Sequence, residues 1–343
     1  MLFIRIAMIA LPLALAGCVP QPEKQVVVYS ALDREFAAPI LGGFYRSTDN
    51  QIRPMPKFDV ESTKTVGLVN RLIAEADQPV CDVFWNNEIM HTLRLQKLGL
   101  LQPHAWQVGP QWPAGMQASD GTWCGFAARA RVLIVNTEQL PDPAEWPRSV
   151  AALADPAWQD RCAMAYPLFG TTATHAAVLD ARLGKEPAAA FFQQVADNAL
   201  ILSGNKQVAL AVSSGQLAWG ITDTDDAIIE RDEGRPVEIV FPDQQPGEPG
   251  TLRIPNTVAI LKGAPHPQAA ARLVDYLVRP ETEGRLAMGN SSQLPIAPTD
   301  VHRPRVLPET PVRWMEVDFE AAAERWTTLA PQLEAIFANA ASD

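Results

Sequence analysis

The stretch Leu217-Ala-Trp-Gly-Ile-Thr-Asp-Thr-Asp-Asp-Ala227 joins an apolar run to three carboxylates. The first half has the composition of a buried strand, and the residues from Ala227 onward predict a helix. Asp223, Asp225 and Asp226 therefore lie where a strand gives way to a helix. In α/β proteins this is the edge of the sheet at which ligands bind. The stretch predicts an α/β fold with a ligand site at these acids.

The first eighteen residues have the pattern of a bacterial lipoprotein signal. Arg5 supplies a positive charge, an apolar run extends from Ile6 to Leu15, and Leu15-Ala-Gly-Cys18 resembles a lipobox. This run of about ten residues is too short to span a bilayer, which takes about twenty. We predict that residues 1–18 are the signal and that Cys18 is lipidated. Residues 19–25 then form a polar tether, which places the protein in the periplasm, anchored to a bacterial membrane.

Composition favours a globular body behind this tether. The chain has 343 residues, of which 47% are hydrophobic and 20% charged, enough for one or two cores. Its net charge is −11 and it contains no Lys/Arg block, which argues against nucleic-acid binding. Beyond Cys18 there are three cysteines, with no spacing typical of zinc. We expect either one disulfide and one buried thiol or three buried thiols among Cys81, Cys124 and Cys162.

Strands and helices alternate along the chain. The first part predicts strands at Gln25–Ser30, near Ile52 and at Cys81–Trp85, with helices at 33–45 and after Thr65. This order implies a parallel sheet with crossover helices. The later part predicts a second α/β unit, with strands at 128–136 and 257–261, a strand and turn at 161–170, and helices at 171–183, 186–197, 208–212, 267–277 and 318–339.

Five segments, in this order, resemble the periplasmic solute-binding proteins of ABC importers, in particular the ferric-ion-binding group. They are Val28-Tyr-Ser30, Asp82-Val-Phe-Trp85, Arg129-Ala-Arg-Val-Leu-Ile-Val-Asn-Thr137, Asn205-Lys-Gln-Val-Ala-Leu-Ala-Val212 and Gly289-Asn-Ser-Ser-Gln-Leu-Pro295. The resemblance implies a type II-like fold of two lobes, each a mixed sheet flanked by helices, joined by a β hinge and closing over a ligand. It places the first lobe at 26–130 plus 258–300 and the second at 131–257 plus 301–343.

One departure from that group concerns the ligand. Its members carry adjacent tyrosines that bind Fe³⁺ at the place where this chain has Asp223-Thr-Asp-Asp226, and none of the four tyrosines here is paired. The resemblance puts Asp33 where some relatives have a metal-binding histidine and Glu88 one residue from a metal-binding glutamate. It also puts Arg129 or Arg131 in the strand that carries an anion-binding arginine.

Two kinds of ligand fit these residues. Four carboxylates suit a hard cation such as Fe³⁺, Mn²⁺ or Ca²⁺. Alternatively, the acids bind the ammonium group of an amino acid or aminophosphonate, while arginine and threonine hold its anionic end. We favour the metal ion as cargo and expect no other cofactor. The predicted metal ligands are Asp33, Glu88, Asp223 and Asp225, and the other predicted ligand-binding residues are Arg129, Thr171, Thr172 and Asn205.

The same acids are compatible with other functions. Helix capping explains one or two acids at a helix start, but not three. A strand followed by Asp223-x-Asp225 is also typical of phosphotransferases that form an aspartyl-phosphate. Those enzymes usually carry Thr or Val where this chain has Ala227, and no later strand ends in a paired-acid motif. We therefore expect a monomeric binding protein that serves an ABC permease and its ATPase, with no catalysis. A metal-dependent phosphatase is the alternative, and a scaffold lipoprotein is a third.

Overall fold

The computed structural model describes residues 24–58, 65–110, 112–297 and 303–338. The predicted signal, the lipidation at Cys18 and nearly all of the tether lie outside these residues. Among the residues that the structure describes, no helix is both long and apolar enough to cross a membrane.

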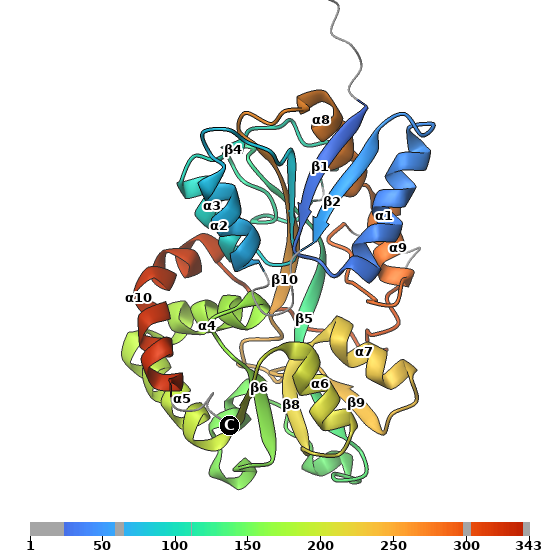
Figure 1. Ribbon diagram of the computed structural model, residues 1–343. Coiled ribbons are helices and arrows are strands. Elements are labelled where there is room, and N and C mark those ends of the chain that lie inside the picture. The colour runs from blue at the N-terminus through green and yellow to red at the C-terminus, as the bar shows by residue number, and fades with distance from the viewer. Residues whose placement is uncertain (1–23, 59–64, 111, 298–302, 339–343) are drawn as a thin grey trace, which may run out of the picture.

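The described strands form one continuous mixed sheet that serves both lobes (Figure 1). Its order is β2-β1-β3-β10-β5-β8-β6-β7, with β4 paired to β10 and β9 to β5. Pairing is parallel within β2-β1-β3 and β8-β6-β7 and antiparallel around β10 and β5. The strands are β1 (Gln25–Ser30), β2 (Arg53–Phe58), β3 (Val83–Asn86), β4 (Leu101–Gln102), β5 (Cys124–Asn136), β6 (Cys162–Ala165), β7 (Leu200–Leu202), β8 (Trp219–Asp223), β9 (Val237–Val240) and β10 (Arg253–Leu261).

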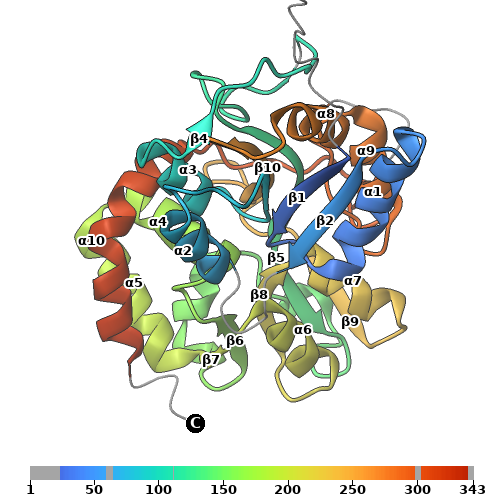
Figure 2. The ribbon, with the colours of Figure 1, turned by 45° about the horizontal axis from the view of Figure 1, so that its top comes forward.

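Helices cover each half of the sheet. The first lobe has α1 (Arg34–Ser47), α2 (Val66–Ala74), α3 (Met90–Lys97), α8 (Pro267–Leu277) and α9 (Pro280–Met288). The second has α4 (Gly170–Leu183), α5 (Lys185–Asn198), α6 (Asn205–Ser213), α7 (Thr224–Asp232) and α10 (Phe319–Phe337), with short 3-10 turns at Pro143–Glu145, Val150–Ala154 and Pro156–Trp158. Helix α10 packs on α4 and α5 and also reaches α3 of the first lobe (Figures 1 and 2).

Strand β5 passes from one lobe into the other. Residues up to Ala130 pair with β10, and residues from Arg131 onward pair with β8 and β9. The two-lobed α/β fold with a β hinge is therefore confirmed. The predicted lobe boundaries remain a prediction, and the one between residues 130 and 131 falls where β5 changes its partner.

A buried carboxylate fixes the hinge region. Glu283 accepts hydrogen bonds from the backbone amides of Ala127 at 2.7 Å, Ile296 at 2.8 Å and Ala297 at 3.0 Å. Ala127 has a φ of 35°, unusual for a residue with a side chain. It forms a bulge in β5 where the register against β10 shifts. Glu283 therefore ties β5 to the segment that follows α9, close to the point where β5 passes from one lobe to the other.

The expected elements formed, with several differences. The helix after β8 begins at Thr224, earlier than predicted, because Asp223 is already its N-cap residue. Strand β5 begins at Cys124, four residues before the predicted start. Strands β4 and β9 and helix α9 were not predicted. Strand β4 has two residues and β9 has four, one of them an exposed glutamate. Helix α9 begins with four polar or proline residues, which obscure the helical pattern of its apolar positions.

Cys81, Cys124 and Cys162 are three buried free thiols, one of the two predicted arrangements. Burial raises the pKa of all three, that of Cys162 to about 12, so these thiols stay protonated and unreactive.

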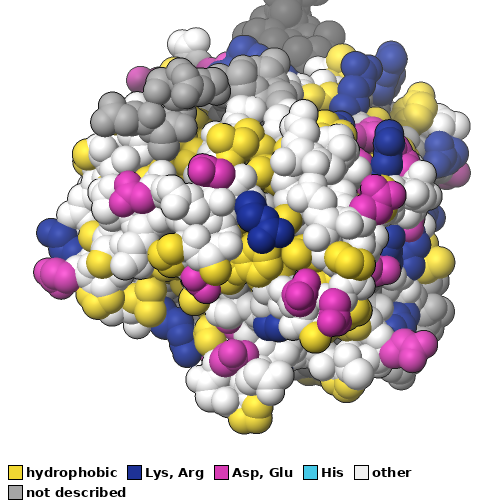
Figure 3. Space-filling model, turned by 90° about the horizontal axis from the view of Figure 1, so that it is seen from below, with side chains coloured by type: hydrophobic (Ala, Val, Ile, Leu, Met, Phe, Trp, Pro, Cys, Tyr) yellow, Lys and Arg dark blue, Asp and Glu magenta, His cyan; other side chains and the backbone are white. Residues whose placement is uncertain are grey.

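On the face drawn in Figure 3, acidic and basic side chains are interspersed rather than gathered by sign.

Candidate functional site

A small cavity lies where the two lobes meet. It has a volume of about 40 Å³, against about 10–15 Å³ for one water molecule by the same measure. The space therefore suits an ion or a small solute. The helices α1, α4, α6 and α7 all begin beside it, so their positive ends favour anionic groups there. The lining residues are Asp33, Asn87, Arg129, Ala165, Tyr166, Phe169, Gly170, Thr171, Thr172, Ser203, Gly204, Asn205, Asp223, Asp225 and Asp226.

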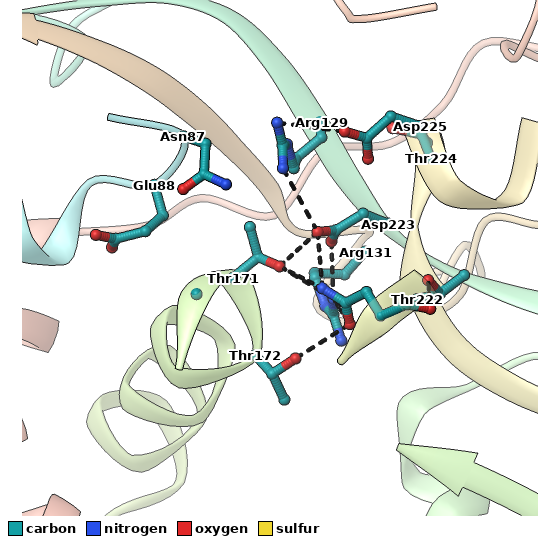
Figure 4. Close-up of polar contacts among 12 residues, drawn as sticks. Asn87, Glu88, Arg129, Arg131, Thr171, Thr172, Thr222, Asp223, Thr224 and Asp225 are labelled. Carbon is teal, nitrogen blue, oxygen red and sulfur yellow. Dashed lines mark hydrogen bonds and ion pairs between the residues drawn. The ribbon is translucent and has the colours of Figure 1, made fainter. Parts of the chain in front are cut away.

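Asp223 is the most heavily bonded side chain of the site. Its Oδ1 accepts from Arg131 Nη1 at 2.7 Å, and its Oδ2 accepts from Thr171 Oγ1 at 2.5 Å and Asn205 Nδ2 at 2.9 Å (Figure 4). Asp223 and Arg131 are directly opposite each other in the β5–β8 register, and both are almost fully buried. The carboxylate is thus neutralised and hydrogen-bonded within the second lobe.

The partners of Asp223 are themselves bonded together. Arg131 Nη1 donates to Asn205 Oδ1 at 2.9 Å and lies 3.3 Å from Thr171 Oγ1. Thr172 Oγ1 also donates to Asn205 Oδ1, at 3.2 Å. Because Thr171 and Thr172 open α4 while Asn205 opens α6, the network fixes both helix starts against β8.

Asp225 has a different environment. It is buried, its Oδ2 lies 3.2 Å from Arg129 Nη2, and its Oδ1 has no hydrogen-bond partner among the described residues. Burial raises the pKa of Asp225 to about 6; Arg129 opposes this shift, and the charges of Asp223 and Asp33 add to it. Asp225 is therefore a buried carboxylate with an open acceptor and too little compensating positive charge.

Arg129 faces the same cavity from β5. Its Nη1 lies 3.9 Å from Asp223 Oδ2, so it interacts with both acids. Within the described chain, its Nε and Nη2 make no hydrogen bond. Burial alone lowers the pKa of Arg129, but the neighbouring carboxylates outweigh it and raise the pKa, so the guanidinium is charged. A cationic group with open donors thus stands beside an acid with an open acceptor.

Besides Arg129, the first lobe adds two residues to the cavity wall, Asp33 at the start of α1 and Asn87 after β3. On the second lobe, Asp226 joins Asp223 and Asp225 in a group in which one carboxylate oxygen from each residue lies within 4.8 Å of the others. Such a spacing is compatible with one metal ion. The acids come from both lobes, so a cation bound among them would hold the lobes together.

Glu88 does not join these acids, contrary to the sequence-based prediction. Its Oε2 accepts from the amide of Met90 at 2.6 Å, and its Oε1 accepts from Asn86 Nδ2 at 2.8 Å and the amide of His91 at 3.1 Å. The carboxylate points away from Asp223 in Figure 4 and borders another groove, between α3 and α10. Residue spacing alone does not tell which way a side chain turns at the end of a strand.

The structure brings together seven of the eight predicted ligand-binding residues, namely Asp33, Arg129, Thr171, Thr172, Asn205, Asp223 and Asp225. It also adds three residues that were not selected. Asn87 and Asp226 border the cavity, and Arg131 pairs with Asp223. Each lies within two residues of a selected one, namely Glu88, Asp225 or Arg129, so the sequence located each cluster but not all of its members.

Comparison with known proteins places this geometry in a family. The sequence profile of the bacterial extracellular solute-binding proteins matches residues 79–322, well over half of the chain. The chain belongs to this family. A similar curated relative is the Fe(3+)-binding periplasmic protein of Serratia marcescens, 23% identical over 304 residues, which cover 86% of each chain.

Solved structures share the fold at lower identity. The apo ferric ion-binding protein A of Pasteurella haemolytica superposes with a TM-score of 0.81 at 20% identity, over 93% of this chain and all of that one. The periplasmic binding protein AfuA of Actinobacillus pleuropneumoniae, solved with fructose-6-phosphate bound, superposes with a TM-score of 0.78 at 20% identity, over 92% of this chain and 99% of that one. These likenesses confirm the predicted fold.

The first prediction concerns Asp223. Replacing it by asparagine leaves the buried Arg131 without its counter-charge, and breaking a buried ion pair typically costs about 3–5 kcal/mol. We expect Asp223→Asn to lower the free energy of unfolding by about 3 kcal/mol, measured by urea denaturation. Asp225→Asn is the matched control and is expected to cost less than about 1 kcal/mol, because Asp225 makes fewer bonds. Equal losses in both variants would contradict the structural role of Asp223.

The second prediction concerns pH. The pKa of Asp225 rises from 3.8 to about 6 on folding, so the folded protein binds this proton more tightly than the unfolded chain. Protonation of Asp225 therefore adds to the free energy of unfolding. This contribution is fully present below the pKa of Asp225 in the unfolded chain and is lost as the pH rises through its folded pKa of about 6. Relative to Asp225→Asn, the ligand-free wild type should lose about 1 kcal/mol of unfolding free energy between about pH 5 and about pH 7. Urea denaturation at both pH values measures it, and a difference that does not change with pH would refute it.

Proposed function

We propose that this protein captures a small, positively charged solute in the cavity between its lobes and delivers it to an ABC permease with its ATPase. Membership of the extracellular solute-binding family supports the capture step. The two lobes joined by a β hinge are an argument for closure around the solute. The same fold is consistent with a monomer that docks on the permease in its closed form.

A positively charged solute is inferred from Asp225, a buried carboxylate with one oxygen that has no hydrogen-bond partner in the described chain. A buried carboxylate with an open oxygen is costly unless a cation or donor completes it. Asp33 faces it from the other lobe, and Asp226 lies next to it. A positive group between these residues would compensate all of them at once.

The proposed cargo is a hard metal cation, with Fe³⁺ as the first choice. Carboxylate oxygens are the ligands that hard cations prefer, and Asp33, Asp225 and Asp226 offer them from both lobes. Asp223 is the least available of the four acids, since Arg131, Thr171 and Asn205 already occupy its oxygens. The Serratia relative is named for Fe³⁺ binding, which supports this choice.

A second candidate is an organic solute that carries both an amine and an anionic group, such as an amino acid or an aminophosphonate. It is favoured by Arg129, whose Nε and Nη2 have no hydrogen-bond partner in the described chain. A guanidinium beside Asp225 suits an anion next to an ammonium group. The AfuA structure has fructose-6-phosphate, an organic anion, bound to a protein of this fold.

Catalysis is not part of the proposal. An aspartyl-phosphate mechanism needs a free nucleophilic carboxylate, whereas Asp223 is bonded to Arg131, Thr171 and Asn205. The phosphatase alternative therefore loses the residue on which it depended.

Binding to the purified mature protein tests the proposal. A specific ligand raises the thermal midpoint by mass action, so we would measure thermal shift and calorimetry with ferric nitrilotriacetate, Mn²⁺, amino acids, aminoalkylphosphonates and fructose 6-phosphate. We expect ferric ion to bind and Asp225→Asn to weaken it at least about tenfold, the worth of one charge-assisted bond.

Glu233→Gln is the control, because it neutralises an exposed acid at the end of α7 far from the cavity bonds. Binding of an amino acid or aminophosphonate but not metal, weakened by Asp225→Asn, would favour the second candidate. Ligand binding that both variants leave unchanged would refute the site.

We also propose that Cys18 carries a lipid anchor, as its sequence context predicts. In a bacterial host, the full-length protein should be found in the membrane fraction, and Cys18→Ser should release it or stop its processing. Mass spectrometry of the amino-terminal peptide would identify the modified cysteine. An unmodified mature chain that begins at another residue would contradict the anchor.

A further inference from the structure

The carboxylate of Glu88 is fixed at the start of α3 in the first lobe. Three donors of that lobe hold it, namely Asn86 Nδ2 and the amides of Met90 and His91, at 2.6–3.1 Å. The side chain is almost completely buried. The positive end of α3 stabilises its charge in this position.

The same carboxylate contacts the second lobe. Thr174 Oγ1 donates a hydrogen bond of 3.0 Å to Glu88 Oε2. Thr174 is fully buried in α4, two residues after Thr172, and Asn87 immediately precedes Glu88. Because Thr172 and Asn87 both line the solute cavity, the bond joins the chain segments that form its two walls.

Each partner keeps a hydrogen bond inside its own lobe. Glu88 has its three first-lobe donors, and Thr174 Oγ1 lies 3.4 Å from the carbonyl of Gly170, one turn earlier in α4. Separation of the lobes therefore leaves neither group unsatisfied, which is the main cost of breaking a buried hydrogen bond. The contact can form and break at each cycle of closure, unlike the Asp223–Arg131 pair, which lies wholly within the second lobe.

We propose that the Glu88–Thr174 hydrogen bond is a closure contact, and that Glu88 is a positioning residue that holds the lobes together without touching the solute. This inference rests on the proposed capture function. A bond made only in the closed state raises the closed population and with it the apparent affinity. Its effect falls mainly on the rate at which the solute leaves.

Thr174→Val tests the contact, because valine keeps the shape and removes the hydroxyl. We expect ferric ion, supplied as the nitrilotriacetate complex, to bind about tenfold more weakly, with faster dissociation and nearly unchanged association. Thr174→Ser restores the hydroxyl and should bind like the wild type. Thr282→Val is the matched control, since its buried hydroxyl donates to Tyr276 within the first lobe; it should not change dissociation.

A second measurement needs no solute. Spin labels at Met55→Cys on β2 and Leu210→Cys on α6, both substantially exposed and on different lobes, report the interlobe distance by pulsed electron resonance. Thr174→Val should shift the ligand-free distances toward longer values, whereas Thr174→Ser and Thr282→Val should not. Distances in Thr174→Val that match the wild type would overturn the closure contact. A shift in a protein that binds none of the tested solutes would support the contact and refute the proposed function.

Discussion

The buried ion pair between Asp223 and Arg131 is the constraint on which the site depends. Two opposite charges directly across β8 and β5 must satisfy each other, because neither reaches water. The remaining capacity of the carboxylate goes to Thr171 and Asn205, the starts of α4 and α6. One polar residue at the end of a buried strand thus positions two helix starts, and the cavity is the space that these elements leave.

This pair also separates the roles of two acids that look equivalent in the sequence. Asp223 forms a close ion pair with Arg131. Asp225 has only the more distant Arg129, and one of its oxygens has no hydrogen-bond partner in the described chain. Two residues of one short segment thus have different roles. Asp223 stabilises the structure through bonds that are already made, and Asp225 is left with an oxygen that can bind the ligand.

Much of this arrangement follows from the sequence. The apolar run before Asp223 predicted β8, and the polar residues after several strands predicted which edge carries the site. The pairing of Asp223 with Arg131 could not be predicted, because the two residues are 92 positions apart and meet only through the register of β5 and β8. The orientation of Glu88 could not be predicted either. Chain position brings a residue to the end of a strand, but the nearby amides of α3 decide where its carboxylate points.

The charges suggest how solute binding drives closure. Asp33 of the first lobe raises the pKa of Asp225 in the second, after the larger effects of burial and the nearer charges, so the acids of the two lobes repel each other when the cavity holds no cation. Closure of the empty protein must overcome this repulsion, and one hydrogen bond between Glu88 and Thr174 opposes it with a modest gain. A cation between the acids reverses the sign of the interaction, so both terms then favour the closed state. The repulsion between Asp33 and Asp225 therefore lowers the closed population of the empty protein, and a bound cation raises it.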